Sequence, residues 1–135
     1  MGMKSRTVPA QTASLHTLAL AVREYGLSLP DAYEDFPWGE RVLKVRKKVF
    51  AFLGSDEHLP EQLGFSVKLP ESGQALLSLP FATPTGYGLG KSGWVSVRCT
   101  PDEPFPLELI QEWLRESYCA IAPKKLAALV RGDAA

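Results

Sequence analysis

Pro37-Trp38-Gly39 and the run that follows, ERVLKVRKKVFAFL at positions 40–53, decide how the rest of the sequence is interpreted. Two apolar segments, Val42–Val45 and Val49–Leu53, lie on either side of three consecutive cations, Arg46-Lys47-Lys48. Short apolar runs separated by a polar turn are typical of a β-hairpin. The stretch therefore predicts an antiparallel hairpin with a positively charged tip.

The tip and the corner of this stretch each raise a question of conformation. A two-residue hairpin turn favours asparagine or glycine because its central residues take positive φ, and Arg46-Lys47 offers neither. The loop is therefore either longer and more open than the spacing indicates, or strained. For Pro37-Trp38-Gly39 we expect a structural corner with the Trp38 ring in the core, in preference to a ligand contact.

Several further segments have the spacing of amphipathic helices. Apolar residues recur at helical spacing from Leu15 to Tyr25, and Gly26 suits the position after the last turn. Pro70 fits the first turn of a second helix, which Pro80 ends. A third helix is predicted in the segment from 107 to 121, with a short tail helix behind it.

Two other segments alternate between apolar and polar residues, as half-buried strands do. They are residues 64–69 and residues 94–98. The order helix, three strands, helix, one or two strands, helix predicts an α+β fold of two layers. Its antiparallel sheet carries the helices on one face and leaves the other face open. We expect a single domain over residues 12–131, preceded by a flexible lead-in at 1–11.

Composition excludes several classes of protein. The chain has 135 residues, no formal net charge and a 45% hydrophobic share, which fits one folded domain. No apolar run approaches the roughly 20 residues of a membrane span, and the first residues lack the apolar middle of a secretory signal. We therefore expect a cytoplasmic protein without membrane contact, with Cys99 and Cys119 as free thiols. His16 and His58 lie far apart without nearby cysteines, so no metal site is expected.

No motif supports catalysis or a cofactor. Gly88-x-Gly90-x-x-Gly93 has the letters of the dinucleotide fingerprint, but the helix that would hold a pyrophosphate is missing after it. Gly90-Lys91-Ser92 resembles the end of a phosphate-binding loop, yet Thr85 stands where that loop needs glycine. No nucleophile motif occurs, and Asp56-Glu57-His58 lies in a polar loop. We therefore expect a protein that is not an enzyme.

The open face of the predicted sheet is a candidate binding surface. Alternation places the following side chains on it: Lys44, Lys48, Ser66, Lys68, Trp94, Ser96 and Arg98. Phe50 and Phe52 share the parity of Lys48. Cations bind phosphates, and neighbouring aromatic rings stack on bases or hold a partner. The alternative is that a loop or the C-terminal tail covers Trp94 and that this face is structural.

A series of short stretches along residues 12–126 matches a known family. They are Leu29-Pro30, Pro37-Trp38-Gly39, Lys44-Val45, Lys48-Val49-Phe50-Ala51, Val67-Lys68-Leu69-Pro70, Tyr87, Lys91, Gly93-Trp94-Val95, Ser117-Tyr118 and Lys124-Lys125. In these residues the chain resembles the MmcQ/YjbR proteins of bacteria. The resemblance implies an α-β(3)-α-β(2)-α fold, similar to secretion chaperones and to a double-wing module, and DNA binding by analogy of fold. Members tend to have glycine in the turn where Arg46-Lys47 stands here.

Two functions follow as hypotheses. The first is binding of duplex or single-stranded DNA through the hairpin tip and the open face. Its predicted contact residues are Lys44, Arg46, Lys47, Lys48, Lys68, Tyr87, Lys91, Trp94 and Arg98. The second is a protein-interaction or small-anion-binding module that uses the same face without catalysis. Eight basic against four acidic residues from position 41 to 98 favour the first, and zero net charge favours the second.

Overall fold

The computed structural model describes residues 14–55, 62–86, 88–102 and 106–132. Its elements are α2 (Ser14–Ser28), β1 (Tyr33–Asp35), β2 (Arg41–Val45), β3 (Lys48–Gly54), β4 (Leu63–Lys68), α3 (Gly73–Leu76), β5 (Ala82–Pro84), the 3₁₀ helix η2 (Leu89–Ser92), β6 (Trp94–Cys99), α4 (Leu107–Ile121) and α5 (Lys124–Arg131). The six strands follow the order β1-β2-β3-β4-β6-β5, and all neighbours are antiparallel. The predicted α+β fold with an antiparallel sheet is confirmed.

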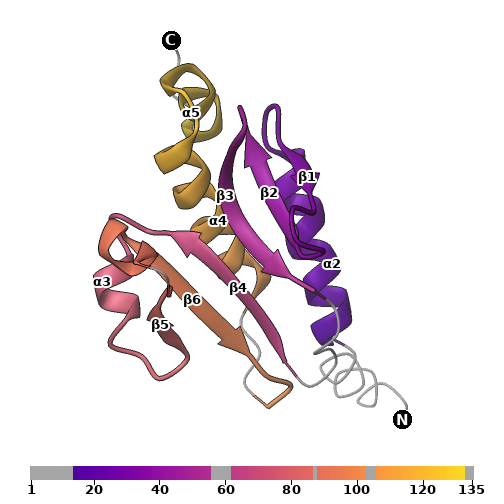
Figure 1. Ribbon diagram of the computed structural model, residues 1–135, viewed down its shortest axis with the longest axis vertical. Coiled ribbons are helices and arrows are strands. Elements are labelled where there is room, and N and C mark those ends of the chain that lie inside the picture. Colours follow the sequence, from indigo (N-terminus) through magenta and orange to yellow (C-terminus); the bar gives the residue numbers. More distant parts are fainter. Residues whose placement is uncertain (1–13, 56–61, 87, 103–105, 133–135) are drawn as a thin grey trace.

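One face of the sheet carries the helices and the core. Helices α2 and α4 lie together on this face, and α5 packs against α4 (Figure 1). The apolar stripe of α2 faces inward, with Leu15, Leu18 and Val22 all buried. On α4 the fully buried residues include Leu114 and Tyr118. The opposite surface of the sheet, here named the open face, carries no helix of the described chain except the short η2 beside β6.

The edge strand β1 was not predicted, because Tyr33–Asp35 shows no apolar alternation. Ion pairs of Glu34 and Asp35 fix this strand beside β2. The carboxylate of Glu34 accepts hydrogen bonds from the guanidinium groups of Arg23 (2.8 and 2.9 Å) and Arg41 (3.1 Å). These two partners keep the pKa of Glu34 below its usual value, with the Arg23 hydrogen bond as the largest cause. Ion pairing thus adds a strand to a connector that the sequence pattern does not mark.

Helix α2 continues through Gly26 to Ser28, so the expected end at Gly26 is wrong. A Cβ atom at position 26 would overlap Cδ1 of Leu43, a fully buried residue of β2. Glycine here serves the close approach of helix and sheet, not a left-handed cap. The predicted helix after Pro70 is shorter than expected, since its α-helical part covers only Gly73–Leu76.

The hairpin closes in a tight two-residue turn. Of the two conformations considered for the tip, the strained turn is therefore confirmed and the longer, more open loop is wrong. Val45 pairs directly with Lys48, and the turn residues Arg46 and Lys47 have φ of +51° and +70°. Residues with a Cβ atom lose about 1–2 kcal/mol each in this left-handed region. The tip therefore stores strain that a glycine would remove.

The pairing register between β2 and β3 shifts at two points, and each shift breaks the alternation of side chains along β3. Val42 pairs with Phe52 and Leu43 with Ala51, but Lys44 pairs with Val49, which leaves Phe50 as an extra residue. Such a bulge turns the following side chains to the other face. Phe50 consequently packs edge-on against Tyr118 of α4 at 5.2 Å, on the helical side. The expectation that Phe50 and Phe52 share one face is wrong for this reason.

A serine of α4 fills the point where strands β3 and β4 separate. The two strands pair only at Ala51 with Val67 and at Phe52 with Ser66. Beyond these pairs, the buried hydroxyl of Ser117 accepts a hydrogen bond from the Lys68 N–H (2.8 Å) and donates one to the Phe50 carbonyl (2.5 Å). The side chain thus replaces a missing strand–strand contact and fixes α4 against the sheet.

The described helices include none whose length and apolar character would let it cross a membrane. Among the described residues, Cys99 is buried and Cys119 half-buried, and no disulfide bond joins the two.

A candidate binding groove on the open face

Two of the predicted contact cations, Lys44 of the open face and Arg46 of the hairpin tip, are already engaged by acids. The ammonium group of Lys44 donates a hydrogen bond to Asp35 at 2.8 Å, and the guanidinium of Arg46 donates one to Asp31 at 3.2 Å. The bond to Asp35 raises the pKa of Lys44, and the same bond, with one from the Phe36 N–H, lowers the pKa of Asp35. An acid therefore offsets the charge of each of these two cations.

Trp94 is buried, which corrects the expectation that its ring is uncovered. Only 6% of this residue is exposed. Its ring lies on the open face, where the edge of Phe52 packs against it at 5.2 Å. The loop after β5 closes over the strand, because the Thr85 N–H donates to the Trp94 carbonyl (3.1 Å) and η2 contacts β6. No face of the indole is left for a base to stack on.

The two cations flanking Trp94 lie at opposite ends of the strand pair. Lys68 pairs with Trp94, whereas Arg98 pairs with Gly64 at the other end. Four residues of strand separate the two positions, or about 13 Å. The predicted cluster of one indole and two adjacent cations is therefore not formed.

Three further predicted cations are exposed at the hairpin end of the sheet, namely Lys47, Lys48 and Lys91. Lys68 is half-buried at the end of β4. Within the described ranges, none of these lysines forms an ion pair. The last predicted contact residue, Tyr87, lies outside the described residues.

The corner Pro37-Trp38-Gly39 forms as predicted, with Gly39 at φ +82°, but its tryptophan is not in the core. Trp38 is 81% exposed and borders the open face. The reason is the short span between β1 and β2, which turns at the sheet edge and leaves the ring outside. Two other aromatic residues before β2 are also exposed, Tyr33 at 41% and Phe36 at 48%.

A cavity of ≈ 570 Å³ opens beneath Trp38. Its apolar lining comes from Trp38, Val42, Phe52 and Leu89. Its polar lining includes Ser66 and Thr85, and its charged lining consists of Glu40 and of Arg41, which is bound to Glu34 at 3.1 Å. Trp38 belongs to the corner before β2, and Leu89 to η2, so two loops wall the strands β2, β3 and β4. This volume matches that of sites that enclose small organic groups.

A second cavity of ≈ 320 Å³ adjoins the first along the sheet. The two share the lining residues Glu40, Phe52, Gly54 and Ser66, and we refer to the combined hollow as the open-face groove. The second part is walled by Pro80 and Phe81 and is bordered by the charged side chain of Arg98. The groove thus joins an apolar end to a charged end.

Three hydroxyl groups form a hydrogen-bonded chain in the groove. Oγ of Ser66 lies 2.7 Å from Oγ of Ser96, which lies 3.0 Å from Oγ1 of Thr85. All three side chains are half-buried and border one or both cavities. They offer polar partners in a surface that is otherwise lined by aromatic and aliphatic groups.

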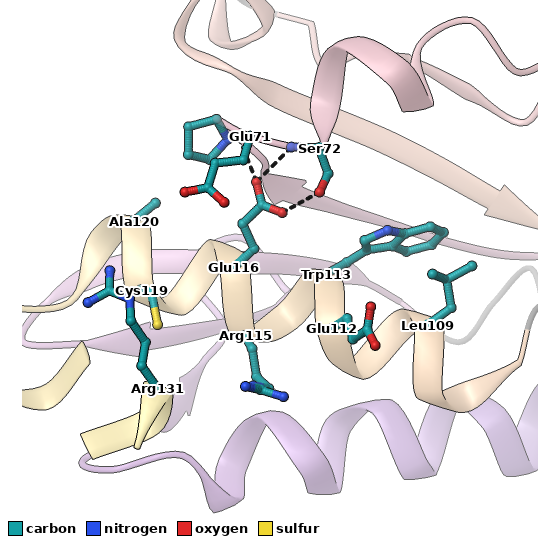
Figure 2. Close-up of a pocket in the computed structure, with 11 residues that line it drawn as sticks. Glu71, Ser72, Leu109, Glu112, Trp113, Arg115, Glu116, Cys119, Ala120 and Arg131 are labelled. Atoms are coloured by element: carbon teal, nitrogen blue, oxygen red, sulfur yellow. Dashed lines mark hydrogen bonds between the residues drawn. The ribbon is translucent and has the colours of Figure 1, made fainter. Parts of the chain in front are cut away.

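A third cavity, of ≈ 530 Å³, lies on the helical side (Figure 2). Figure 2 shows Glu116 pointing from α4 to the chain before α3, while Arg115 points away from it. The Glu116 carboxylate accepts hydrogen bonds from the N–H groups of Glu71 (2.7 Å) and Ser72 (2.9 Å) and from the Ser72 hydroxyl (2.6 Å). These bonds fix a turn, and the other charges do not converge, so this hollow is a weaker candidate.

The described residues contain no group of three or more His, Cys, Asp or Glu side chains that could hold a metal ion. Chemistry at the groove therefore rests on its apolar lining, hydroxyls and flanking charges.

Comparison with known proteins agrees with the fold. The model of the YjbR family matches residues 27–120. The chain belongs to the YjbR family. The crystal structure of Deinococcus radiodurans protein DR2400, with the domain DUF419, is similar to this YjbR chain at a TM-score of 0.57. The two are 33% identical, and the match covers 73% of each chain. No curated protein matches this YjbR chain.

The apolar end of the groove in this YjbR chain was not predicted, because no sequence pattern marks its residues. Trp38 was assigned to the core, and Leu89 lies in a loop without alternation. The signal that could have found them is the series Tyr33, Phe36 and Trp38, three aromatic residues in a stretch with no strand or helix pattern. Aromatic residues that no predicted core face accounts for are candidates for an exposed contact surface.

Proposed function

We propose that this YjbR protein is a binding module without catalytic activity, and that its contact site is the open-face groove. The observation that carries the proposal is the position of Trp38, which is 81% exposed beside a cavity lined by Val42, Phe52 and Leu89. Tryptophan is among the residues that most often dominate the free energy of binding at interfaces. A partner that inserts an apolar group beneath the indole would bury both surfaces.

The surroundings of the groove support the same proposal. Tyr33 and Phe36 extend the exposed aromatic surface along the edge of the sheet. The guanidinium of Arg41 lies 5.2 Å from the centroid of the Phe36 ring, which orients this ring beside the corner. Several exposed aromatic residues within one short stretch favour a contact site at this edge.

DNA binding is a second proposal, and the four lysines at the hairpin end of the sheet favour it. Lys47, Lys48, Lys68 and Lys91 lie at the end where β3 begins and β4 ends, and none is paired with an acid of the described chain. Four phosphate contacts would give a log–log salt slope of about −3.6 on duplex DNA. The burial of Trp94 and the neutralised Lys44 and Arg46 make this proposal the weaker one.

An uncharged fluorescent dye, Nile red, tests the groove. We expect wild-type protein to bind the dye, and Trp38→Ala to weaken binding by about thirtyfold, since an interface tryptophan contributes on the order of 2 kcal/mol. Leu129→Ala is the matched control because Leu129 is 66% exposed on α5, away from the groove. Equal affinities of wild type and Trp38→Ala would exclude the groove as an apolar contact site.

Fluorescence anisotropy with labelled duplex and single-stranded oligonucleotides tests the DNA proposal. Binding should weaken strongly between about 50 and about 200 mM salt, and the double variant Lys47→Glu/Lys48→Glu should abolish it. Lys124→Glu/Lys125→Glu makes the same charge change at an exposed pair on α5 and is expected to keep affinity. Absence of binding at low salt to both oligonucleotides would end the DNA proposal and leave the groove proposal standing.

A further inference from the structure

The charged end of the groove places opposite charges around one small space. Glu40 and Arg98 both line the cavity of ≈ 320 Å³, and both residues are exposed. Neither forms an ion pair with any described residue. The two side chains come from different elements, since Glu40 follows the corner at Gly39 and Arg98 lies on β6. Arg98 pairs with Gly64, whose missing side chain leaves room for the guanidinium.

These charges select among possible ligands. A simple anion would meet the Glu40 carboxylate as well as Arg98, and a simple cation would meet Arg98 as well as Glu40. A ligand that carries one charge of each sign close together satisfies both groups at once. The carboxylate–guanidinium contact can be bidentate, which fixes the orientation of the ligand.

The hydroxyl chain adds a hydrogen-bond donor between the charged and the apolar ends. Ser66, Ser96 and Thr85 carry three hydroxyl protons, and the two bonds between them use two. The third proton remains for an acceptor on a bound molecule. When Thr85 donates to Ser96 and Ser96 donates to Ser66, the free proton is that of Ser66, which borders both cavities, and the acceptor then lies where the charged end meets the space beneath Trp38.

We propose that the groove binds a small zwitterion of the α-amino-acid type with a large apolar side chain. Its ammonium group faces Glu40, its carboxylate faces Arg98, and its side chain lies between Trp38, Phe52 and Leu89. A free amino acid and a dipeptide share this chemistry. The inference rests on the proposed groove function and adds the chemical class of its ligand.

Isothermal titration calorimetry with four compounds tests the assignment. L-phenylalanine and the dipeptide phenylalanyl-phenylalanine carry both charges, 2-phenylethylamine lacks the carboxylate, and 3-phenylpropanoate lacks the ammonium group. We expect at least one zwitterion to bind about tenfold more tightly than either truncated compound, since each lost charge pair removes a charge-assisted hydrogen bond. Which zwitterion binds more tightly distinguishes a free amino acid from a peptide.

Two variants assign the charges to their partners. Arg98→Gln should lower affinity for the zwitterion about tenfold and leave 2-phenylethylamine unchanged, while Glu40→Gln should lower it similarly and leave 3-phenylpropanoate unchanged or tighter. Arg115→Gln and Glu108→Gln, at exposed positions of α4, are the matched controls and should change nothing.

Failure of the ligand assignment can be separated from failure of the groove. If Nile red binding depends on Trp38 but all four compounds bind equally weakly, or ignore both charge variants, the amino-acid assignment is wrong and the groove remains. If Nile red binding is also independent of Trp38, both proposals fall.

Discussion

The hydroxyl of Ser117 donates a 2.5 Å hydrogen bond to the carbonyl oxygen of Phe50, from a helix to a strand that lie 67 positions apart in sequence. The same hydroxyl accepts the Lys68 N–H, so one side chain satisfies two backbone groups where β3 and β4 separate. Both strands also border the open-face groove. Ser117 therefore stabilises the fold and also fixes two strands that border the groove.

Replacing Ser117 by alanine is expected to destabilise the protein by about 2–3 kcal/mol. The substitution leaves a buried N–H and a carbonyl without partners, and each such group costs roughly 1–3 kcal/mol. Chemical denaturation followed by circular dichroism measures the change. Ser92→Ala, at an exposed serine of η2, should alter the free energy of unfolding by less than about 0.5 kcal/mol. A comparable loss in both variants would contradict the role of Ser117.

The turn at the hairpin tip can be relaxed. Lys47 has φ +70°, so Lys47→Gly should raise the free energy of unfolding by about 1 kcal/mol, because glycine adopts this conformation without a Cβ penalty. Lys48→Gly is the control. Lys48 lies in β3, where glycine weakens a strand, so this variant should be less stable than wild type. A loss of stability in Lys47→Gly would show that the turn is not strained.

The two tryptophans of the open face should differ sharply in their contribution to folding. Trp38→Ala is expected to change the free energy of unfolding by less than about 0.5 kcal/mol, since the residue is 81% exposed. Trp94→Ala should cost about 3 kcal/mol or more, since only 6% of this residue is exposed. Thermal unfolding of the two variants gives the comparison. Should Trp38→Ala prove as costly, the ring would be a structural residue and not a contact residue.

The Arg23–Glu34–Arg41 cluster makes stability depend on pH in the acid range. The pKa of Glu34 is lower in the folded state, chiefly through its hydrogen bond with Arg23, so the unfolded chain binds the proton first. The contribution is fully present above the unfolded pKa and is lost as pH falls through the folded one. Glu34→Gln should thus be less stable than wild type at neutral pH. The difference in the free energy of unfolding between the two proteins should narrow below about pH 4.

Denaturation curves at several pH values measure this difference in the free energy of unfolding. Glu24→Gln, at an exposed carboxylate on the same helix as Arg23, is the control and should show no such narrowing. A gap for Glu34→Gln that stays constant from neutral to strongly acid pH would contradict the linkage.

The parts of the structure that could be predicted are those where side-chain periodicity follows the backbone. Residues 94–98 alternate, and Val95 and Val97 are buried while Arg98 is exposed. The hairpin was predicted at the right place, but its turn is one residue shorter than the three cations expected at the tip, because Lys48 already pairs with Val45. Periodicity fails in β3, because a bulge at Phe50 shifts the alternation, and at Gly26, where a tertiary contact decides the residue.

The groove was harder to predict because loops form half of it. Ser66 and Ser96 were placed on the open face by alternation, and they do form a pair there at 2.7 Å. The orientation of Trp38 depends on how the span between β1 and β2 turns at the sheet edge. The burial of Trp94 depends on how the chain after β5 returns. Neither path is encoded in a local pattern.

The bulge in β3 has a consequence for the evolution and engineering of this chain. Phe50 anchors the core and Phe52 forms the floor of the groove, and a single extra residue in the strand keeps them on opposite sides. Deleting one residue between Val49 and Phe52 would rotate one of the two rings to the wrong layer. The number of residues in this strand is therefore as tightly constrained as their identity, and loops, not β3, are where insertions can alter what the groove accepts.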